Sequence, residues 1–283
     1  MISAKHRIVI LIFAAIMVFA LQHPENLFPK EQKLLIATTT SLDNTGFLDS
    51  LNELWRKKTG LGFEWISVGT GLALEAAKNC NVDLVLVHAP ELEKKFIKEG
   101  YGFYRKTFMR SRFIIVGPES DPVSIKGLNP VEAFQRIYKK RAKFVSRGDH
   151  SGTNVKELWL WKMAGLKPPF KDEWYVESGQ GMLATLRIAD NIGAYTLTDR
   201  PTYLRFLQLE KDSTGLRELA WDKELLNNPY SAIAVNPEKC PDTKFKIAVE
   251  FIDWLSSPDV IYLIHSFKIN NEFCFELKSN FEF

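Results

Sequence analysis

Four short polar segments of the sequence hold the side chains best suited to binding an anion. They are TTTS (38–41), GTG (69–71), SRGDHSGT (146–153) and GQGM (179–182). Each places hydroxyl-bearing or small residues immediately before a predicted helix, where unpaired N–H groups and the helix dipole favour a bound anion. Any one of them is also explained as an ordinary N-cap that satisfies its own helix. The four together favour a binding site.

One arginine lies in the third segment. Arg147 follows a predicted strand directly, and its guanidinium offers a rigid fork of donors that suits oxyanions. The alternative is a salt bridge to Asp149 or a surface position. Asp149 itself has two open roles: it orients Arg147, or it accepts a hydrogen bond from a protonated ligand. The second role would favour phosphate over dianions that carry no proton.

Catalytic and metal-binding arrangements have little support. His150 adjoins Asp149 and Ser151, but three consecutive residues cannot easily form a base, its orienting group and a nucleophile. No histidine pair or carboxylate cluster has metal-ligand spacing, and neither a dinucleotide fingerprint nor a Walker motif is present. We therefore expect no enzymatic activity, no cofactor and no metal cation, with a hydrolase as the weaker alternative.

The composition is that of a folded protein. The 283 residues are 46% hydrophobic and 25% charged, which excludes a disordered chain, and their number predicts one large or two medium domains. The 37 basic and 34 acidic residues leave a net charge of +3, too small for a nucleic-acid-binding protein.

The N-terminus has the pattern of a secretory signal. Lys5 and Arg7 precede an apolar run at 8–19, and Ala20 ends the small-residue pattern that signal peptidase accepts. The run is short for a membrane span of about 20 residues. We predict a signal peptide at 1–20 and a periplasmic protein, with an uncleaved N-terminal anchor as the alternative.

The rest of the chain alternates apolar runs with helical periodicity. Predicted strands lie at 33–37, 63–68, 82–88, 112–117, 142–146, 174–177, 194–198 and 230–235. Predicted helices lie at 47–60, 72–80, 90–99, 131–140, 154–164, 182–191, 245–256 and 258–267. Three βα units in succession predict a parallel sheet covered by helices, that is, an α/β fold. Such sheets bind ligands at the carboxyl ends of their strands, which would gather the four polar segments.

Composition shifts near residue 118 and again near 205–228, which predicts two lobes. Lobe I would comprise residues 33–117 and about 210–283, and lobe II residues 118–209. The C-terminal helices would then complete the first lobe.

Three cysteines follow the predicted signal. An odd number in an exported chain leaves at least one free thiol. Cys274, between Phe273 and Phe275, is typical of a core residue, and a Cys240–Cys274 bridge stays open. None of the three lies near the cleavage site, where a lipid-bearing cysteine would be expected.

At these motifs the chain resembles the tungstate-binding, TupA-like branch of the periplasmic binding-protein superfamily, type II. The matching stretches include ATTTSLDNTG (37–46), VGTGLAL (68–74), VDLVLVHAP (82–90), VSRGDHSGTN (145–154) and AYTLTDR (194–200), in order over roughly 33–265. The departures are Asn154 where the family often has His, Pro201 where Gly is usual, and the tail from Asn270 onward.

The resemblance implies two α/β lobes that close on an oxyanion in the cleft between them. It also implies delivery to an ABC transporter permease with its ATPase, and we expect a monomer. Carried over by motif, the oxyanion donors are Thr40, Ser41, Thr70, Arg147, Ser151, Thr153, Gln180 and Gly181. Tungstate and molybdate are tetrahedral dianions of nearly equal size, so the choice of tungstate rests on the resemblance alone. Molybdate, sulfate and phosphate stay alternatives, as does a domain that senses a ligand for signalling.

Overall fold

The computed structural model describes residues 33–211 and 213–277. The predicted signal peptide at 1–20 lies outside these residues. Every described helix and strand belongs to the compact unit Leu34–Phe283. Within the described ranges, no helix has both the length and the apolar character needed to cross a membrane.

A seven-stranded sheet forms the centre of the described chain. Its order is β2 (Phe63–Val68), β1 (Leu34–Thr39), β3 (Leu84–Val87), β9 (Asn227–Val235), β4 (Gly102–Pro118) and β7 (Thr196–Asp199), with β8 (Leu216–Ala220) also paired to β4. Strands β2, β1 and β3 are parallel, as predicted. Strand β9, for which the sequence predicted no direction, runs antiparallel to both β3 and β4, so the sheet is mixed. A smaller parallel sheet joins β5 (Phe144–Ser146) to β6 (Tyr175–Glu177).

Ten helices and a short hairpin complete the described elements. The helices are α2 (Thr40–Asp43), α3 (Phe47–Thr59), α4 (Thr70–Lys78), α5 (Pro90–Lys98), α6 (Pro130–Lys140), α7 (Gly152–Met163), α8 (Met182–Ile192), α9 (Arg200–Glu210), α10 (Phe245–Trp254) and α11 (Pro258–Ser266); the hairpin is β10 (Lys268–Ile269) with β11 (Glu272–Phe273). In α3, Phe47, Leu51 and Trp55 are buried at helical spacing, and Gly60 ends the helix in the left-handed conformation.

The sequence prediction missed α9, β8 and the first ten residues of β4, as well as the short elements α2, β10 and β11. The start of β4 is rich in basic residues, which hide its strand character. Arg105, Arg110 and Arg112 each pair with a carboxylate that lies outside β4 in the chain, Glu93, Glu276 and Glu218, at 2.7, 2.9 and 3.1 Å. Their charges are therefore compensated by tertiary contacts that the local pattern does not reveal.

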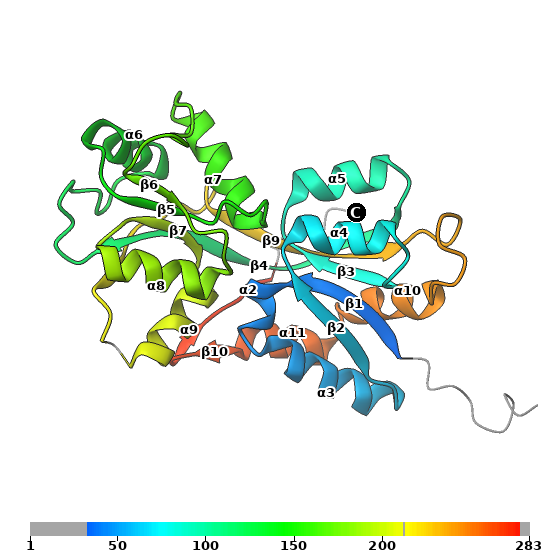
Figure 1. Cartoon of the computed structure of the whole chain (residues 1–283). Coiled ribbons are helices and arrows are strands. Elements are labelled where there is room, and N and C mark those ends of the chain that lie inside the picture. Colours follow the sequence, from blue (N-terminus) through cyan, green and yellow to red (C-terminus); the bar gives the residue numbers. More distant parts are fainter. Residues whose placement is uncertain (1–32, 212, 278–283) are drawn as a thin grey trace, which may run out of the picture. The chain divides into compact units, whose positions relative to one another are not determined.

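The fold has two lobes, seen as the blue-to-cyan and green halves in Figure 1. Helices α4 and α5 cover one face of the first-lobe sheet and α3, α10 and α11 cover the other. Met109 and Tyr230 lie in the core of the first lobe, while Phe113 and Leu226 lie in that of the second. Strands β4 and β9 therefore connect the two lobes.

We propose that the lobes divide within 110–112 and 227–229. This differs from the predicted boundaries near residues 118 and 210. Leu216 and Leu219 pack in the core clusters of the second lobe, because β8 pairs with the part of β4 that lies there.

A disulfide joins Cys80 to Cys240. The Cys240–Cys274 bridge that the sequence left open is not formed, and Cys274 is a buried free thiol. The bonded pair is separated by 160 residues and comes together because β3 and β9 are neighbours in the sheet. Burial raises the pKa of the Cys274 thiol to about 12, so it is protonated at neutral pH.

Candidate functional site

The first polar segment follows β1 and forms the single turn α2, where the sequence predicted a loop. Thr39 is its N-cap: the Thr39 hydroxyl accepts the Leu42 N–H at 3.4 Å and lies 3.2 Å from the Ser41 hydroxyl. Ser41 is buried. The Thr40 hydroxyl is also buried and has no hydrogen-bond partner among the described residues. This turn therefore places two hydroxyls, those of Thr40 and Ser41, beyond the carboxyl end of β1.

The second segment begins α4. Thr70 is the first residue of the helix, and its N-cap Gly69 supplies no side-chain cap. The Thr70 hydroxyl is fully buried and has no hydrogen-bond partner in the described chain. A helix start without a side-chain cap leaves N–H donors in its first turn, and the Thr70 hydroxyl lies beside them.

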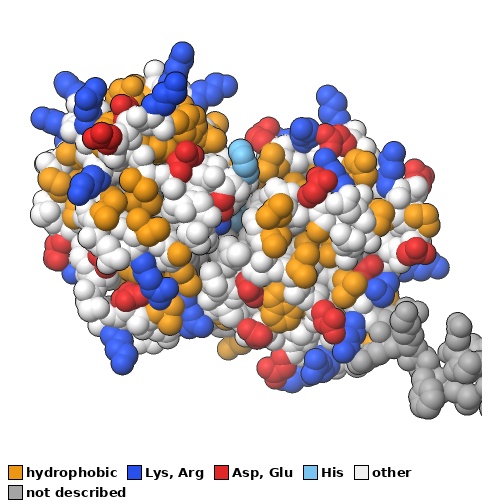
Figure 2. Space-filling view, in the orientation of Figure 1, with side chains coloured by type: hydrophobic (Ala, Val, Ile, Leu, Met, Phe, Trp, Pro, Cys, Tyr) orange, Lys and Arg blue, Asp and Glu red, His pale blue; other side chains and the backbone are white. Residues whose placement is uncertain are grey.

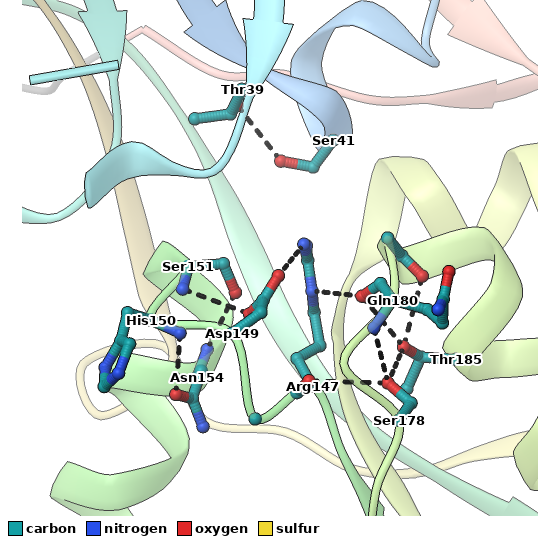
Figure 3. Close-up of polar contacts among 12 residues, drawn as sticks. Thr39, Ser41, Arg147, Asp149, His150, Ser151, Asn154, Ser178, Gln180 and Thr185 are labelled. Atoms are coloured by element: carbon teal, nitrogen blue, oxygen red, sulfur yellow. Dashed lines mark hydrogen bonds and ion pairs between the residues drawn. The ribbon is translucent and has the colours of Figure 1, made fainter. Parts of the chain in front are cut away.

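Arg147 is buried in the third segment, and the protein holds its guanidinium on two sides. Nε donates to the Gln180 carbonyl at 3.1 Å, and Nη2 forms an ion pair with Asp149. The other Asp149 carboxylate oxygen accepts the Ser151 N–H at 3.1 Å. Figure 3 shows the guanidinium pointing toward Ser41 of the first lobe. Both carboxylate oxygens of Asp149 have protein partners, which supports its role in orienting Arg147.

Helix α7 follows Arg147 in the chain. Ser151 is its N-cap, and its hydroxyl accepts the Asn154 N–H at 3.3 Å. The Thr153 hydroxyl is buried without a hydrogen-bond partner among the residues that the structure describes. Asn154, a departure from the family pattern, accepts the His150 N–H at 3.1 Å and donates to the Ser146 hydroxyl at 3.3 Å. Its side chain therefore holds the loop that carries Arg147.

The fourth segment contributes less than predicted. The Gln180 side chain is exposed. The backbone N–H of Gln180 donates to the Ser178 hydroxyl at 3.2 Å, and the backbone carbonyl accepts from Arg147. Gln180 thus positions Arg147, and its backbone N–H is already engaged. Gly181 is the N-cap of α8 and has no side chain to cap the helix. The N–H groups in the first turn of α8 therefore have no side-chain cap.

The segments of the two lobes meet across a cleft. A methyl group on Gly69 would lie 3.9 Å from the Ser151 Cα, and one on Gly71 would lie 3.6 Å from the His150 carbonyl oxygen. The surface is hollowed between the lobes (Figure 2). The starts of α4 and α7 therefore face the same space as α2 and Arg147. The predicted residues with side-chain donors belong to these segments: Thr40 and Ser41 lie in α2, Thr70 begins α4, and Arg147, Ser151 and Thr153 lie before or at the start of α7.

Sequence reasoning missed His88. The imidazole is buried, with Nε2 3.1 Å from the Ser41 hydroxyl and Nδ1 2.8 Å from the Asn228 side-chain oxygen. Burial lowers the pKa of His88 from 6.5 to about 4, the hydrogen bond to Asn228 opposes this, and the nearby charge of Arg147 lowers it further. His88 ends a buried strand, so the rule that sites form at carboxyl ends of strands could have found it.

The cleft is not built as a cation site. The described residues contain no group of three or more His, Cys, Asp or Glu side chains that could hold a metal ion. The donors described above are hydroxyls, helix N–H groups and one guanidinium, a set that suits an anion. Burial raises the pKa of the Asp199 carboxyl, although the Thr202 donors and the charge of Arg147 oppose that shift.

Two α/β lobes with hydrogen-bond donors for an anion on both sides of a cleft define a solute-binding protein. Residues 28–259 match the family model of the PBP superfamily domain. The chain is 42% identical over 232 residues to the tungstate-binding protein TupA of Campylobacter jejuni, covering 82% of this chain and 86% of that protein. It is 38% identical over 267 residues to TupA of Peptoclostridium acidaminophilum, covering 89% and 91%.

A solved structure agrees with these relatives. The tungstate-binding protein TupA of Desulfovibrio alaskensis superposes with a TM-score of 0.77 at 43% identity, covering 87% of this chain and 99% of that one. The chain belongs to the PBP superfamily and, within it, to the TupA family. The predicted fold class and resemblance are confirmed, and these relatives are binding proteins, not enzymes.

Proposed function

We propose that the protein is a periplasmic solute-binding protein that captures tungstate and delivers it to the permease of an ABC transporter. One observation carries the proposal. The hydroxyls of Thr40, Thr70 and Thr153 are all buried, and none has a hydrogen-bond partner among the described residues. A buried polar group without a partner is costly, so these three hydroxyls at the starts of α2, α4 and α7 favour a ligand that completes their hydrogen bonds.

A tetrahedral dianion matches this donor set. Tungstate has only acceptor oxygens at neutral pH, whereas the Thr40, Thr70 and Thr153 hydroxyls and the helix N–H groups can donate to it. Arg147 supplies the positive charge, and the ion pair with Asp149 holds it in place. Many hydrogen bonds in a closed site then offset the cost of removing water from the dianion. The proposed ligand-binding residues are Thr40, Ser41, Thr70, Arg147, Ser151, Thr153 and Gly181, with Gln180 acting through its carbonyl on Arg147.

The choice of oxyanion does not rest on Asp149. Phosphate carries a proton near neutral pH and needs an acceptor in its site. Each Asp149 oxygen accepts one hydrogen bond from the protein, from Arg147 or Ser151, and keeps a second lone pair, so Asp149 does not decide between phosphate and dianions without a proton. Tungstate is preferred to molybdate because the relatives named above are tungstate-binding proteins.

The remaining parts of the proposal concern the transporter partner, the oligomeric state and the location of the protein. Closure of the lobes on the ligand would create a surface formed by both, which the permease recognises, and the ATPase acts on the cytoplasmic side of that permease. We propose that the protein acts as a monomer in the periplasm and is exported by the signal at 1–20.

Isothermal titration calorimetry on the purified chain from Leu21 onward tests the proposal. We expect tight 1:1 binding of tungstate, weaker competition by molybdate and none by phosphate. Preference for sulfate or phosphate would show that the protein binds a different oxyanion with the same fold. Absence of heat with every tetrahedral oxyanion would refute an oxyanion-binding function. Turnover of a phosphate ester that depends on Ser151 would instead favour a hydrolase.

A further inference from the structure

A serine directly before Arg147 closes the turn that carries this arginine. Ser146 ends β5, and its side chain is buried. Its hydroxyl oxygen accepts the Gly148 N–H at 3.2 Å and the Asn154 side-chain amide at 3.3 Å. The contact with Gly148 spans Arg147, so it forms a tight turn around that residue. A hydroxyl oxygen has two lone pairs, and both are therefore used by N–H donors.

The proton of the Ser146 hydroxyl points to a buried carboxyl group. Glu157, on α7, is 2% exposed, and its Oε2 accepts from Ser146 at 2.5 Å. Its Oε1 accepts the Trp161 indole N–H at 3.0 Å and the Tyr175 hydroxyl at 2.7 Å. Burial raises the pKa of the Glu157 carboxyl, and these three donors oppose the shift. Glu157 thereby fixes the rotation of the Ser146 hydroxyl, with both lone pairs toward the loop that holds Arg147.

The other end of this loop is tied to the same hydroxyl. Asn154 donates to Ser146, and its side-chain oxygen accepts the His150 N–H at 3.1 Å (Figure 3). On the far side, the Gly179 N–H donates to the Arg147 carbonyl at 2.9 Å. The Arg147 backbone is therefore fixed within a short loop. The position of that backbone determines where the guanidinium enters the cleft.

Ser146 has no hydrogen-bonding group left for an oxyanion. Its single proton is directed at Glu157, and its lone pairs face N–H donors. An anion that only accepts hydrogen bonds therefore gains nothing from this hydroxyl. The effect of Ser146 on ligand binding must pass through the loop that carries Arg147.

We propose that Ser146 and Glu157 are positioning residues for oxyanion binding: Glu157 fixes the Ser146 hydroxyl, and Ser146 closes the turn that holds Arg147 toward the ligand. The inference rests on the proposed oxyanion function. A guanidinium that is already in place loses less conformational freedom when the ligand binds, which raises affinity.

Two variants that each remove one hydroxyl from Glu157 test the inference. Ser146→Ala and Tyr175→Phe both delete a hydroxyl that donates to this carboxyl group, but only Ser146 bonds to the loop that carries Arg147. In tungstate titrations we expect Ser146→Ala to weaken binding roughly tenfold, the effect of one lost hydrogen bond. Tyr175→Phe should stay within about twofold of the wild type. Equal losses in the two variants would overturn the inference.

A double-mutant cycle separates positioning of Arg147 from a general loss of structure. In the Arg147→Ala background, Ser146→Ala should change the affinity by less than about twofold, because the group that Ser146 positions is already absent. A further loss of roughly tenfold in that background would overturn the inference, because Ser146 would then act on the ligand by another route.

Glu157→Gln tests the role of the carboxyl group. The Trp161 indole N–H can only donate, so it draws the new amide oxygen to the position of Oε1 and leaves the amide nitrogen toward Ser146. The Ser146 proton then loses its acceptor, and the hydroxyl is no longer held in one rotation. We expect this variant to weaken tungstate binding by about threefold to tenfold. Unchanged or tighter binding would overturn the role of Glu157.

Stability measurements separate the two levels of the proposal. Urea denaturation of each variant reports its stability independently of its affinity. If Ser146→Ala does not fold, Asn154→Ala replaces it in the comparison with Tyr175→Phe and should also weaken binding, because Asn154 ties Ser146 to His150. Affinities that follow stability alone would leave Ser146 and Glu157 packing residues while the oxyanion function stands. A wild-type protein that binds no oxyanion would overturn both.

Discussion

Replacement of Arg147 by alanine tests the electrostatics of the cleft most directly. The Arg147 side chain is buried, and its guanidinium is held in one position by Asp149 and the Gln180 carbonyl. At an effective dielectric constant of about 20, unit charges about 4 Å apart interact by about 4 kcal/mol. Loss of a hydrogen bond to a charged group costs about 1.5–3 kcal/mol.

The variant also leaves Asp149 without its partner. Its carboxylate would then face the incoming dianion and repel it, which adds to the loss. We therefore expect Arg147→Ala to weaken tungstate binding by about 3–4 kcal/mol, or roughly two to three orders of magnitude.

Calorimetry, with molybdate displacement where direct titration is too tight, measures the change. Arg187→Ala is the matched control, since this arginine on α8 is half exposed, pairs with Glu210 and changes the net charge equally. The affinity of Arg187→Ala for tungstate should fall by less than about twofold, because an exposed ion pair contributes little. If Arg147→Ala stays within about fivefold of the wild type while folded, the guanidinium does not contact the ligand and the reasoning fails.

Three further predictions follow from the packing and the disulfide. Cys80→Ser should lower the free energy of unfolding by about 3–5 kcal/mol, because the bridge closes a loop of 160 residues; urea denaturation of the variant measures this, and an unchanged midpoint would contradict it. Gly152→Ala places a methyl group 2.9 Å from the His88 ring, so it should lower the free energy of unfolding by about 1–3 kcal/mol; urea denaturation measures this, and an unchanged midpoint would show that the ring can move without cost. Because burial lowers the pKa of His88 from 6.5 to about 4, the neutral ring contributes stability above pH 6.5 that is lost as the pH falls toward 4. The free energy of unfolding of the wild type minus that of His88→Gln should therefore shrink, by at most about 3 kcal/mol, from pH 7 to 4.5. A difference that stays constant with pH would refute the lowered pKa of His88.

Local patterns in the sequence were sufficient to predict most of the elements. Helix α3 and its Gly60 end, strand β2 and helix α8 have side chains whose periodicity or capping depends only on near neighbours. The polar segments could be predicted as a site for a related reason. Each lies where a strand meets a helix: two follow β1 and β2 of the large sheet and two follow β5 and β6 of the small sheet, and parallel pairing brings the two junctions of each pair to one edge.

Contacts between distant residues were beyond the reach of local patterns. The disulfide from Cys80 joins a cysteine 160 residues away, and the sequence had considered only the pair Cys240 and Cys274. The long strand β4 was cut short in the prediction, because its arginines read as surface residues until their partners are known.

The sequence by itself determined the donor types, the segments that carry them and the family to which the chain is similar. Only the tertiary structure showed that Asp149 orients Arg147, that the Gln180 carbonyl supports the same guanidinium, and that His88 connects Ser41 to Asn228. The physical reason is that a hydrogen bond depends on the distance and direction between two atoms. Neither is specified until strands far apart in the chain have paired and the lobes have packed.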